Sequence, residues 1–154
     1  MEKRKYVIGV DYGTDSCRVL IVDGFDGQEI ASAVSFYPRW KQGLYCDARS
    51  QRYRQHPLDY LETLEDAVRK AVASVPGDQS WEISALAFDT TGSTPVLTDR
   101  EGVPLSLTPA FAEEPDAMFV LWKDHTAIRE AEQINAMAKA SGTDYTCYSG
   151  GIYS

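Results

Sequence analysis

Two apolar runs flank a short polar turn in the stretch Tyr6-Val7-Ile8-Gly9-Val10-Asp11-Tyr12-Gly13-Thr14-Asp15-Ser16-Cys17-Arg18-Val19-Leu20-Ile21-Val22-Asp23. This pattern predicts a β-hairpin whose turn is residues 13–16. The turn is rich in backbone N–H and hydroxyl donors. Small residues let the backbone approach an anion, and oriented amides carry partial positive charge. The hairpin therefore predicts a site for a polyphosphate.

The residues on either side of this turn support the same interpretation. Arg18 can donate two hydrogen bonds to a phosphate, and Asp11 can hold the Mg²⁺ that accompanies a nucleotide. The predicted phosphate ligands are Gly13, Thr14, Ser16 and Arg18. The alternative is an ordinary hairpin turn that binds nothing, since such residues are common in turns.

Composition limits the possible functions. The chain has 154 residues, enough for one domain, and a formal net charge of −8. An acidic chain without a basic stripe argues against nucleic-acid binding and against adhesion to anionic membranes. The apolar run after the basic start is too short for a signal peptide, and no stretch is long enough to cross a membrane. Three widely spaced cysteines indicate neither disulfides nor zinc, so we expect a cytoplasmic protein.

The rest of the chain alternates strands and helices. A third strand is expected at about 29–36, followed by an irregular excursion over 37–56. A helix begins near Pro57, with Asp59 and Glu62 as a capping box, and ends at Pro76-Gly77. Its apolar face is predicted to contain Leu61, Leu64, Val68, Ala71, Val72 and Val75.

A buried strand is predicted at 83–88, followed by a polar turn at 89–94. Val96 and Leu97 are expected to begin a returning strand, and residues 99–102 form a further hairpin turn. A last helix over 126–139 would turn Ala127, Ala131, Ile134 and Ala138 inward. The order βββαβα predicts an α/β fold with a mixed sheet, of the ribonuclease H-like (actin-like ATPase) type. Both polar turns would then open onto one cleft, beyond the carboxyl ends of the strands.

A second candidate site follows the apolar run 118–121. Trp122 offers a flat apolar face to sugar C–H groups, and Lys123 and Asp124 can hydrogen-bond hydroxyls. An equally good alternative is a core tryptophan followed by a helix N-cap at Asp124 or Thr126.

Several segments together resemble the FGGY carbohydrate kinases, from Tyr6 to Ser154. These segments are Val-Asp-Tyr-Gly-Thr-Asp-Ser (10–16), Tyr-Pro-Arg-Trp-Lys (37–41), Gly-Leu-Tyr-Cys-Asp (43–47), Arg-Gln-His-Pro (54–57), Asp-Thr-Thr-Gly-Ser-Thr-Pro (89–95), Ala-Met-Phe-Val-Leu-Trp-Lys-Asp-His (117–125) and Tyr-Ser-Gly-Gly-Ile-Tyr-Ser (148–154). The more specific ones are similar to the branch of the family that acts on L-ribulose.

The resemblance implies MgATP-dependent phosphorylation of L-ribulose to L-ribulose 5-phosphate, in L-arabinose breakdown. It places Asp11 near Mg²⁺ and Thr14 and Arg18 near the ATP phosphates, with Gly13 allowing close backbone approach. The implied sugar contacts are Gly92, Ser93, Thr94, Trp122, Lys123, Asp124 and Tyr153.

Kinases of this family are much longer and have two lobes. The resemblance therefore implies that residues 1–154 are an incomplete N-terminal lobe, with the second lobe and the catalytic-base aspartate downstream. We expect no catalytic residue in this chain, no turnover by the chain alone, and self-association into a homo-oligomer through exposed faces.

Two other functions remain open at this point. One is a stand-alone, non-catalytic module for sugar or nucleotide binding or for assembly. The other is a two-metal nuclease of the same fold, with Asp11 and Asp89 as metal ligands at the ends of neighbouring strands.

Overall fold

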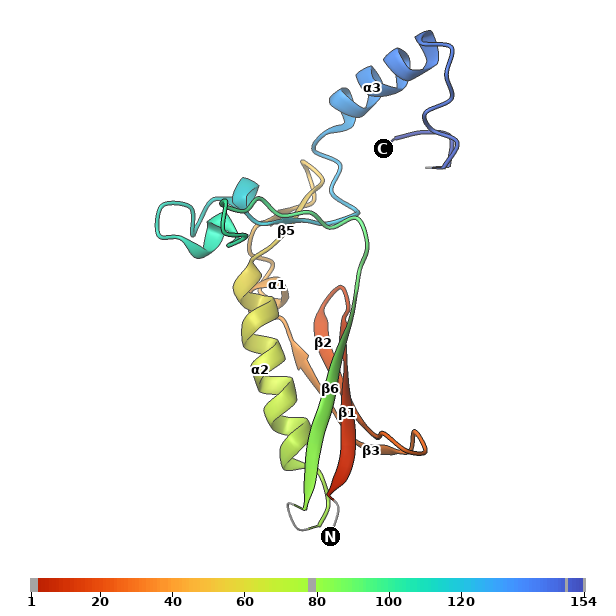
Figure 1. Cartoon of the computed structure of the whole chain (residues 1–154). Coiled ribbons are helices and arrows are strands. Elements are labelled where there is room, and N and C mark those ends of the chain that lie inside the picture. Colours follow the sequence, from red (N-terminus) through yellow and green to blue (C-terminus); the bar gives the residue numbers. More distant parts are fainter. Residues whose placement is uncertain (1–2, 78–79, 149, 154) are drawn as a thin grey trace.

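A four-stranded mixed sheet forms the main body of the computed structural model, which describes residues 3–77, 80–148 and 150–153 (Figure 1). The strand order is β3-β2-β1-β6. Strands β1 (Arg4–Tyr12), β2 (Ser16–Asp23) and β3 (Glu29–Phe36) form an antiparallel meander, and β6 (Trp81–Thr90) pairs with β1 in parallel. The predicted α/β class and mixed sheet are confirmed. Ser149 and Ser154, from the last segment quoted above, lie outside the described residues.

The core lies between this sheet and helix α2 (Pro57–Ala73), which packs on β2 and β3. Side chains alternate along a strand, so every second residue faces the helix. The buried set from the strands is Tyr6, Ile8, Val10, Cys17, Val19, Ile21 and Ala31. On the helix the buried face runs through Tyr60, Thr63, Ala67 and Ala71. Leu61 was predicted on this face but is 53% exposed, because it lies about 100° around the helix from Tyr60.

The start of α2 differs from the predicted capping box. His56 is the N-cap, and its Nδ1 accepts a hydrogen bond from the Leu58 N–H at 3.0 Å. The Nε2–H therefore donates to the Ala112 carbonyl at 3.2 Å. Burial and the nearby Arg39 charge lower the pKa of His56, in keeping with a neutral ring.

Asp59 and Glu62 bind α1 (Pro38–Lys41) instead of capping their own helix. The Asp59 carboxylate is fully buried and accepts from the N–H groups of Arg39 and Trp40 at 3.2 and 3.1 Å, and from Arg39 Nη1 at 2.9 Å. Glu62 accepts from the same guanidinium, and this hydrogen bond lowers the pKa of Glu62. Asp59 and Glu62 thus attach α1, which follows β3 in the chain, to the N-terminal part of α2.

Strand β6 pairs with β1 as predicted, but it is not buried. Ile83, Leu86 and Phe88 are 37%, 47% and 56% exposed, because α2 covers β2 and β3 rather than β6. In the described part of the chain, nothing pairs with the other edge of this strand. Helix α3 (Ile128–Ala140) likewise buries no residue and stands apart from the sheet (Figure 1). Its predicted inward face was wrong.

A second, small sheet lies beyond the end of the main one. It contains β4 (Cys46–Asp47), β5 (Arg52–Gln55) and β7 (Phe119–Val120), so the predicted irregular excursion is partly ordered into α1, β4 and β5. Single helical turns occur at η1 (Leu105–Leu107) and η2 (Pro115–Ala117). The returning strand predicted at Val96 is wrong, since only a bridge between Thr98 and Pro104 closes the expected turn at 99–102. No helix among the described residues has the length and apolar character needed to cross a bilayer.

Arg54 and Asp124 join the small sheet to the chain that follows β7. Asp124 Oδ2 accepts from Arg54 Nε and from the Tyr53 N–H, both at 2.8 Å. Its Oδ1 accepts from the N–H and hydroxyl of Thr126 at 3.1 and 2.6 Å. Although burial alone would raise the pKa of Asp124, these hydrogen bonds lower it to about 2.

We expect Asp59→Ala to lower the free energy of unfolding by about 3 kcal/mol, because it removes a fully buried carboxylate and leaves three half-buried donors of α1 without an acceptor. Urea denaturation measures this change. The matched control is Glu65→Ala on the same helix, whose ion pair with Arg69 is exposed on both sides and should contribute less than about 1 kcal/mol. Equal losses in the two variants would contradict the assigned role of Asp59.

Asp124 should make stability depend on pH in the acid range. Its folded pKa of about 2 lies below the ordinary 3.8, so the unfolded chain takes up the proton first. The stabilisation is therefore present above about pH 4 and is lost as the pH falls towards 2. Urea denaturation should show that Asp124→Asn has a lower free energy of unfolding than the wild type at neutral pH. Between about pH 4 and pH 2, the free energy of unfolding of this variant should also change less with pH than that of the wild type. Asp116→Asn is the control, since that carboxylate is 78% exposed. A wild-type slope retained in Asp124→Asn would refute the assignment.

Candidate functional site

In the loop between β1 and β2, residues 13–16, the first three carbonyl groups accept hydrogen bonds from Tyr37 and Gln55, and the fourth accepts one from within the loop. In order along the loop, they accept from the Tyr37 hydroxyl at 3.0 Å, Gln55 Nε2 at 2.6 Å, the Tyr37 N–H at 2.9 Å and the Gly13 N–H at 2.9 Å. Within residues 3–77, 80–148 and 150–153, the N–H groups of Thr14 and Asp15 have no partner. The loop therefore presents donors outward, as an anion site requires.

The predicted phosphate ligands differ in accessibility. Thr14 is half-buried and Arg18 is exposed, while Ser16 is 1% exposed and its hydroxyl donates to Asp15 Oδ1 at 2.8 Å. Gly13 has room for a Cβ, whose nearest neighbour would be the Ser16 carbonyl at 3.5 Å. The open groups of the loop are thus its amides and the Thr14 side chain, with Arg18 beside them.

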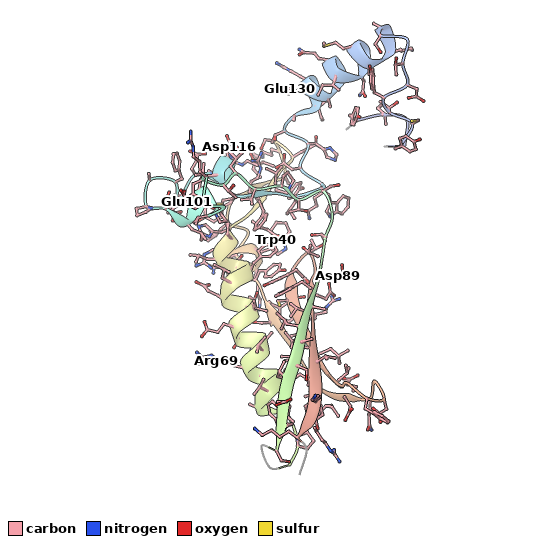
Figure 2. All side chains as sticks on the ribbon, viewed as in Figure 1. Trp40, Arg69, Asp89, Glu101, Asp116 and Glu130 are labelled. Atoms are coloured by element: carbon pink, nitrogen blue, oxygen red, sulfur yellow. The ribbon has the colours of Figure 1, made fainter. Side chains whose placement is uncertain are left out.

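Asp11, Arg18 and Asp89 lie together on the sheet face away from α2. Asp11 is the register partner of both other residues, and directly paired residues share a face. Arg18 Nη1 is 3.4 Å from Asp11 Oδ2, and all three line a cavity of about 440 Å³. Figure 2 shows Asp89 and Trp40 at this same end of the sheet.

The donor set here fits a hard cation. Two carboxylates on adjacent strands suit Mg²⁺, which binds through one or two carboxylates together with substrate phosphates. The described residues contain no group of three or more His, Cys, Asp or Glu side chains placed to hold a metal alone. Burial raises the pKa of the neighbouring Tyr12 to about 12 and of Cys17 to about 11, so both stay neutral.

The turn at Gly92, Ser93 and Thr94 directly follows β6. Ser93 has a φ of 54°, and the Thr94 hydroxyl donates to the Gly92 carbonyl at 3.2 Å. The Thr91 hydroxyl is buried and lacks a partner among the described residues. The Val120 N–H donates to the Pro95 carbonyl at 2.9 Å, which joins this turn to the chain just before Trp122.

The predicted sugar residues after β7 have three different surroundings. Trp122 is 60% exposed. The Lys123 ammonium lies over the rings of Trp40 and Tyr53, 4.8 and 4.6 Å from their centres. Asp124 is 1% exposed at its side chain, with both oxygens bonded as described above. A sugar contact by Asp124 stays a prediction, whereas its present bonds fix the turn that carries Trp122.

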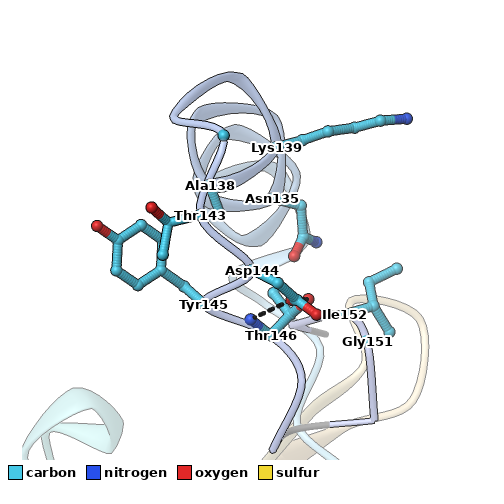
Figure 3. Close-up of a pocket in the computed structure, with 10 residues that line it drawn as sticks. Asn135, Ala138, Lys139, Thr143, Asp144, Tyr145, Thr146, Gly151 and Ile152 are labelled. Atoms are coloured by element: carbon cyan, nitrogen blue, oxygen red, sulfur yellow. Dashed lines mark hydrogen bonds between the residues drawn. The ribbon is translucent and has the colours of Figure 1, made fainter.

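Tyr153 lies in a separate part of the molecule. Its backbone exchanges two hydrogen bonds of 2.8 Å with the Asn135 side chain of α3, and its hydroxyl donates to the Tyr145 carbonyl at 3.1 Å. A cavity of about 500 Å³ lies beside this segment, lined in part by Asn135 and Thr146 (Figure 3). No predicted site residue lines it, and no described hydrogen bond links Tyr153 to Trp122 or Gly92.

Sequence reasoning missed the residues that shape the phosphate loop. Tyr37 and Gln55 hold its carbonyls, and Tyr60 donates to Gln55 Oε1 at 2.6 Å. Arg54 and Gln55 were noticed only as part of a motif shared with a family. Arg and Gln side chains are seldom buried. The one signal for these two residues in the sequence was their position directly before the start of a predicted helix.

Comparison with known proteins gives sequence relatives and structural neighbours, although no family model matches the chain. A ribulokinase of Vibrio parahaemolyticus is 46% identical over 98% of this chain and 27% of its own length. A ribulokinase of Halalkalibacterium halodurans is 36% identical over 96% of this chain and 27% of its own. The chain thus spans about a quarter of the length of these relatives.

Solved sugar-kinase structures have the same fold. A gluconate kinase from Lactobacillus acidophilus matches 94% of this chain and 24% of its own, with a TM-score of 0.64 and 18% identity. A xylulose kinase from Bifidobacterium adolescentis matches 92% of this chain and 22% of its own, with a TM-score of 0.60 and 22% identity. These neighbours confirm the predicted ribonuclease H-like, actin-like ATPase fold. Along nearly its whole length the chain therefore resembles the ribulokinases and the FGGY-type sugar kinases, and it corresponds to an N-terminal fragment of such a kinase, about a quarter of the length of these relatives.

Proposed function

We propose that this chain supplies the phosphate loop and part of the sugar pocket of a kinase that transfers a phosphoryl group from MgATP to L-ribulose. The observation that carries the proposal is the loop at residues 13–16: the Gly13, Thr14 and Asp15 carbonyls are held by Tyr37 and Gln55, and the Thr14 and Asp15 amides have no partner among the described residues. The similarity to ribulokinases along the chain supports L-ribulose as the sugar and L-ribulose 5-phosphate as the product. We further propose that residues 1–154 belong to one N-terminal lobe.

The nucleotide side of the proposal uses four kinds of group. The Thr14 and Asp15 amides and the Thr14 hydroxyl donate to phosphate oxygens. Gly13 allows the backbone to approach the phosphate closely, and the buried Ser16 supports the loop through its hydrogen bond to Asp15. Arg18 adds a charged, two-pronged donor. Asp11, with Asp89 beside it, would hold Mg²⁺, which when bound neutralises charge on the phosphates.

The sugar side uses the turn at Gly92, Ser93 and Thr94 together with Trp122, Lys123 and Asp124. The Pro95–Val120 hydrogen bond supports this grouping, since it joins the two segments. Trp122 would stack on the sugar, and the Thr91 hydroxyl, which has no partner within the described part of the chain, is a further donor close to the turn. Tyr153 enters the proposal only if the segment after α3 moves towards Trp122.

The proposal assigns no general base to residues 1–154. Phosphoryl transfer depends on positioning both substrates with water excluded, and the chain covers about a quarter of the kinases it resembles. The chain alone would then bind ligands without turnover, as the stand-alone binding module would.

A nuclease is not favoured, because the relatives are kinases. Cys17, Cys46 and Cys147 are free thiols, which supports a cytoplasmic location.

We also propose self-association through β6, whose outer edge is unpaired in the described part of the chain and whose apolar side chains are exposed. The accessible surface is 10345 Å², about a third more than the roughly 7,800 Å² expected for a compact monomer of 17.1 kDa. Long, exposed apolar edge strands promote pairing with another chain. Leu86 and Phe88 would lie in such an interface.

Binding of MgATP and L-ribulose to the chain tests the function. Isothermal titration calorimetry should show both, with Arg18→Met weakening MgATP about tenfold through a lost charged contact. Arg69→Met, on the outer side of α2, is the control (Figure 2). Trp122→Ala should weaken L-ribulose, whereas Phe25→Ala, at a residue 97% exposed, should not. A coupled assay should show no sugar-dependent ATP turnover. Failure to bind either ligand, or equal MgATP affinity in both arginine variants, would refute the proposal.

Sedimentation velocity tests the self-association. The wild-type chain should form larger species as its concentration rises. Leu86→Lys should shift the distribution towards monomer, because a charge on β6 opposes edge pairing. Leu61→Lys is the matched control, a similarly exposed leucine on α2. A compact monomer at all concentrations would show that the uncovered strand does not drive association.

A further inference from the structure

Four consecutive residues, Arg54-Gln55-His56-Pro57, form a buried junction that the proposed function leaves unexplained. Arg54, Gln55 and His56 are 6%, 1% and 4% exposed. Each of them bonds a different segment: Arg54 the chain after β7, Gln55 the phosphate loop, and His56 both α2 and the Ala112 carbonyl. Buried polar side chains need partners, and these three find them in separate segments of the chain, two of which belong to the proposed site.

Gln55 controls the direction of one amide in the phosphate loop. Its Nε2 donates to the Thr14 carbonyl at 2.6 Å. That carbonyl and the Asp15 N–H belong to the same planar trans peptide, so they point in opposite directions. Holding the oxygen inward therefore turns the Asp15 N–H outward. Tyr60 fixes the Gln55 amide in turn, by donating its hydroxyl to Oε1 at 2.6 Å.

Arg54 holds the other half of the site. Its Nε donates to Asp124 Oδ2 at 2.8 Å and its Nη2 to the Thr126 hydroxyl at 3.0 Å, while Nη1 reaches the exposed Asp116 carboxylate at 3.1 Å. The Leu121 N–H also donates to the Tyr53 carbonyl at 3.2 Å. Trp122 lies between these attachment points, so its backbone is fixed on both sides.

We propose that Gln55 and Arg54 are positioning residues that set the phosphate loop and the Trp122 turn at a fixed separation. The inference rests on the proposed function. Neighbouring residues of a strand point to opposite faces, so two adjacent side chains of β5 can hold one half-site each. Phosphoryl transfer between two bound substrates requires the reacting atoms to be held close together and aligned. A junction that fixes both half-sites would provide this alignment.

The test compares Gln55→Met and Arg54→Lys in this chain. Calorimetry measures affinity for MgATP and for L-ribulose, and ¹H–¹⁵N spectra report the Thr14 and Asp15 amides and the Trp122 indole. Gln55→Met should weaken MgATP about tenfold and L-ribulose less than about twofold, with only the loop amides displaced. Arg54→Lys should do the reverse. Gln42→Met is the control, an exposed glutamine with a similar bond to the Pro38 carbonyl.

Other results would overturn the inference. These are equal weakening of both ligands in each variant, or no change beyond that of Gln42→Met. If the wild-type chain binds neither ligand, the proposed function fails, and the ligand-free spectra decide the inference: separate displacement supports it, and joint displacement of loop and indole refutes it. If Gln55→Met does not fold, Tyr60→Phe replaces it, because it frees the Gln55 amide to turn. Thr126→Val replaces Arg54→Lys in the same way.

Discussion

The alternation of side chains along β1 and β2 is the constraint on which the rest of the structure depends. One face of this hairpin, with Ile8, Val10 and Val19, is buried in the same core cluster as the inner face of α2. Each such side chain stabilises the fold by about 1.5–3 kcal/mol, so the register cannot slip by one residue. Asp11 and Arg18 must then point to the opposite face, where the neighbouring β6 adds a second carboxylate. The chemistry of the site follows from the packing of the core.

The end of the sheet is organised differently, by buried polar groups rather than by apolar packing. Asp59 anchors α1 and Arg54 anchors the turn after β7, and each has its hydrogen-bonding capacity used by donors or acceptors from distant segments. A buried polar group without a partner costs several kcal/mol, so such a network permits few alternative arrangements. Apolar contacts alone would allow the loops to shift, whereas directional bonds fix them. This arrangement suits a site built from three separate segments, namely residues 13–16, the turn at 92–94 and the turn after β7.

The sequence predicted the parts of the structure that depend on local pattern. The hairpin at 6–23, the third strand and the helix from Pro57 all follow from periodicity and turn residues within short windows. It failed where partners are distant: Asp59 and Glu62 looked like a capping box, but their carboxylates are taken by Arg39. The strand at 83–88 is apolar and was predicted to be buried. It is exposed because α2 packs on β2 and β3, and no other described element covers β6. For the site, residue types indicated the phosphate loop and the flanking Asp11 and Arg18. They did not indicate Gln55, because its role depends on one hydrogen bond to a loop that is distant in sequence.

The position of β6 at the border of the sheet has a consequence for how its backbone meets water. In a parallel pair, successive amide groups of a strand point alternately to its two sides. Those of β6 that face β1 are bonded, while the intervening ones face the open border and are in contact with solvent. Deuterium should replace every second amide proton along this strand early and the others only when the sheet opens. β1, enclosed by β2 and β6, has no such alternation and becomes the slowest-exchanging part of the fold.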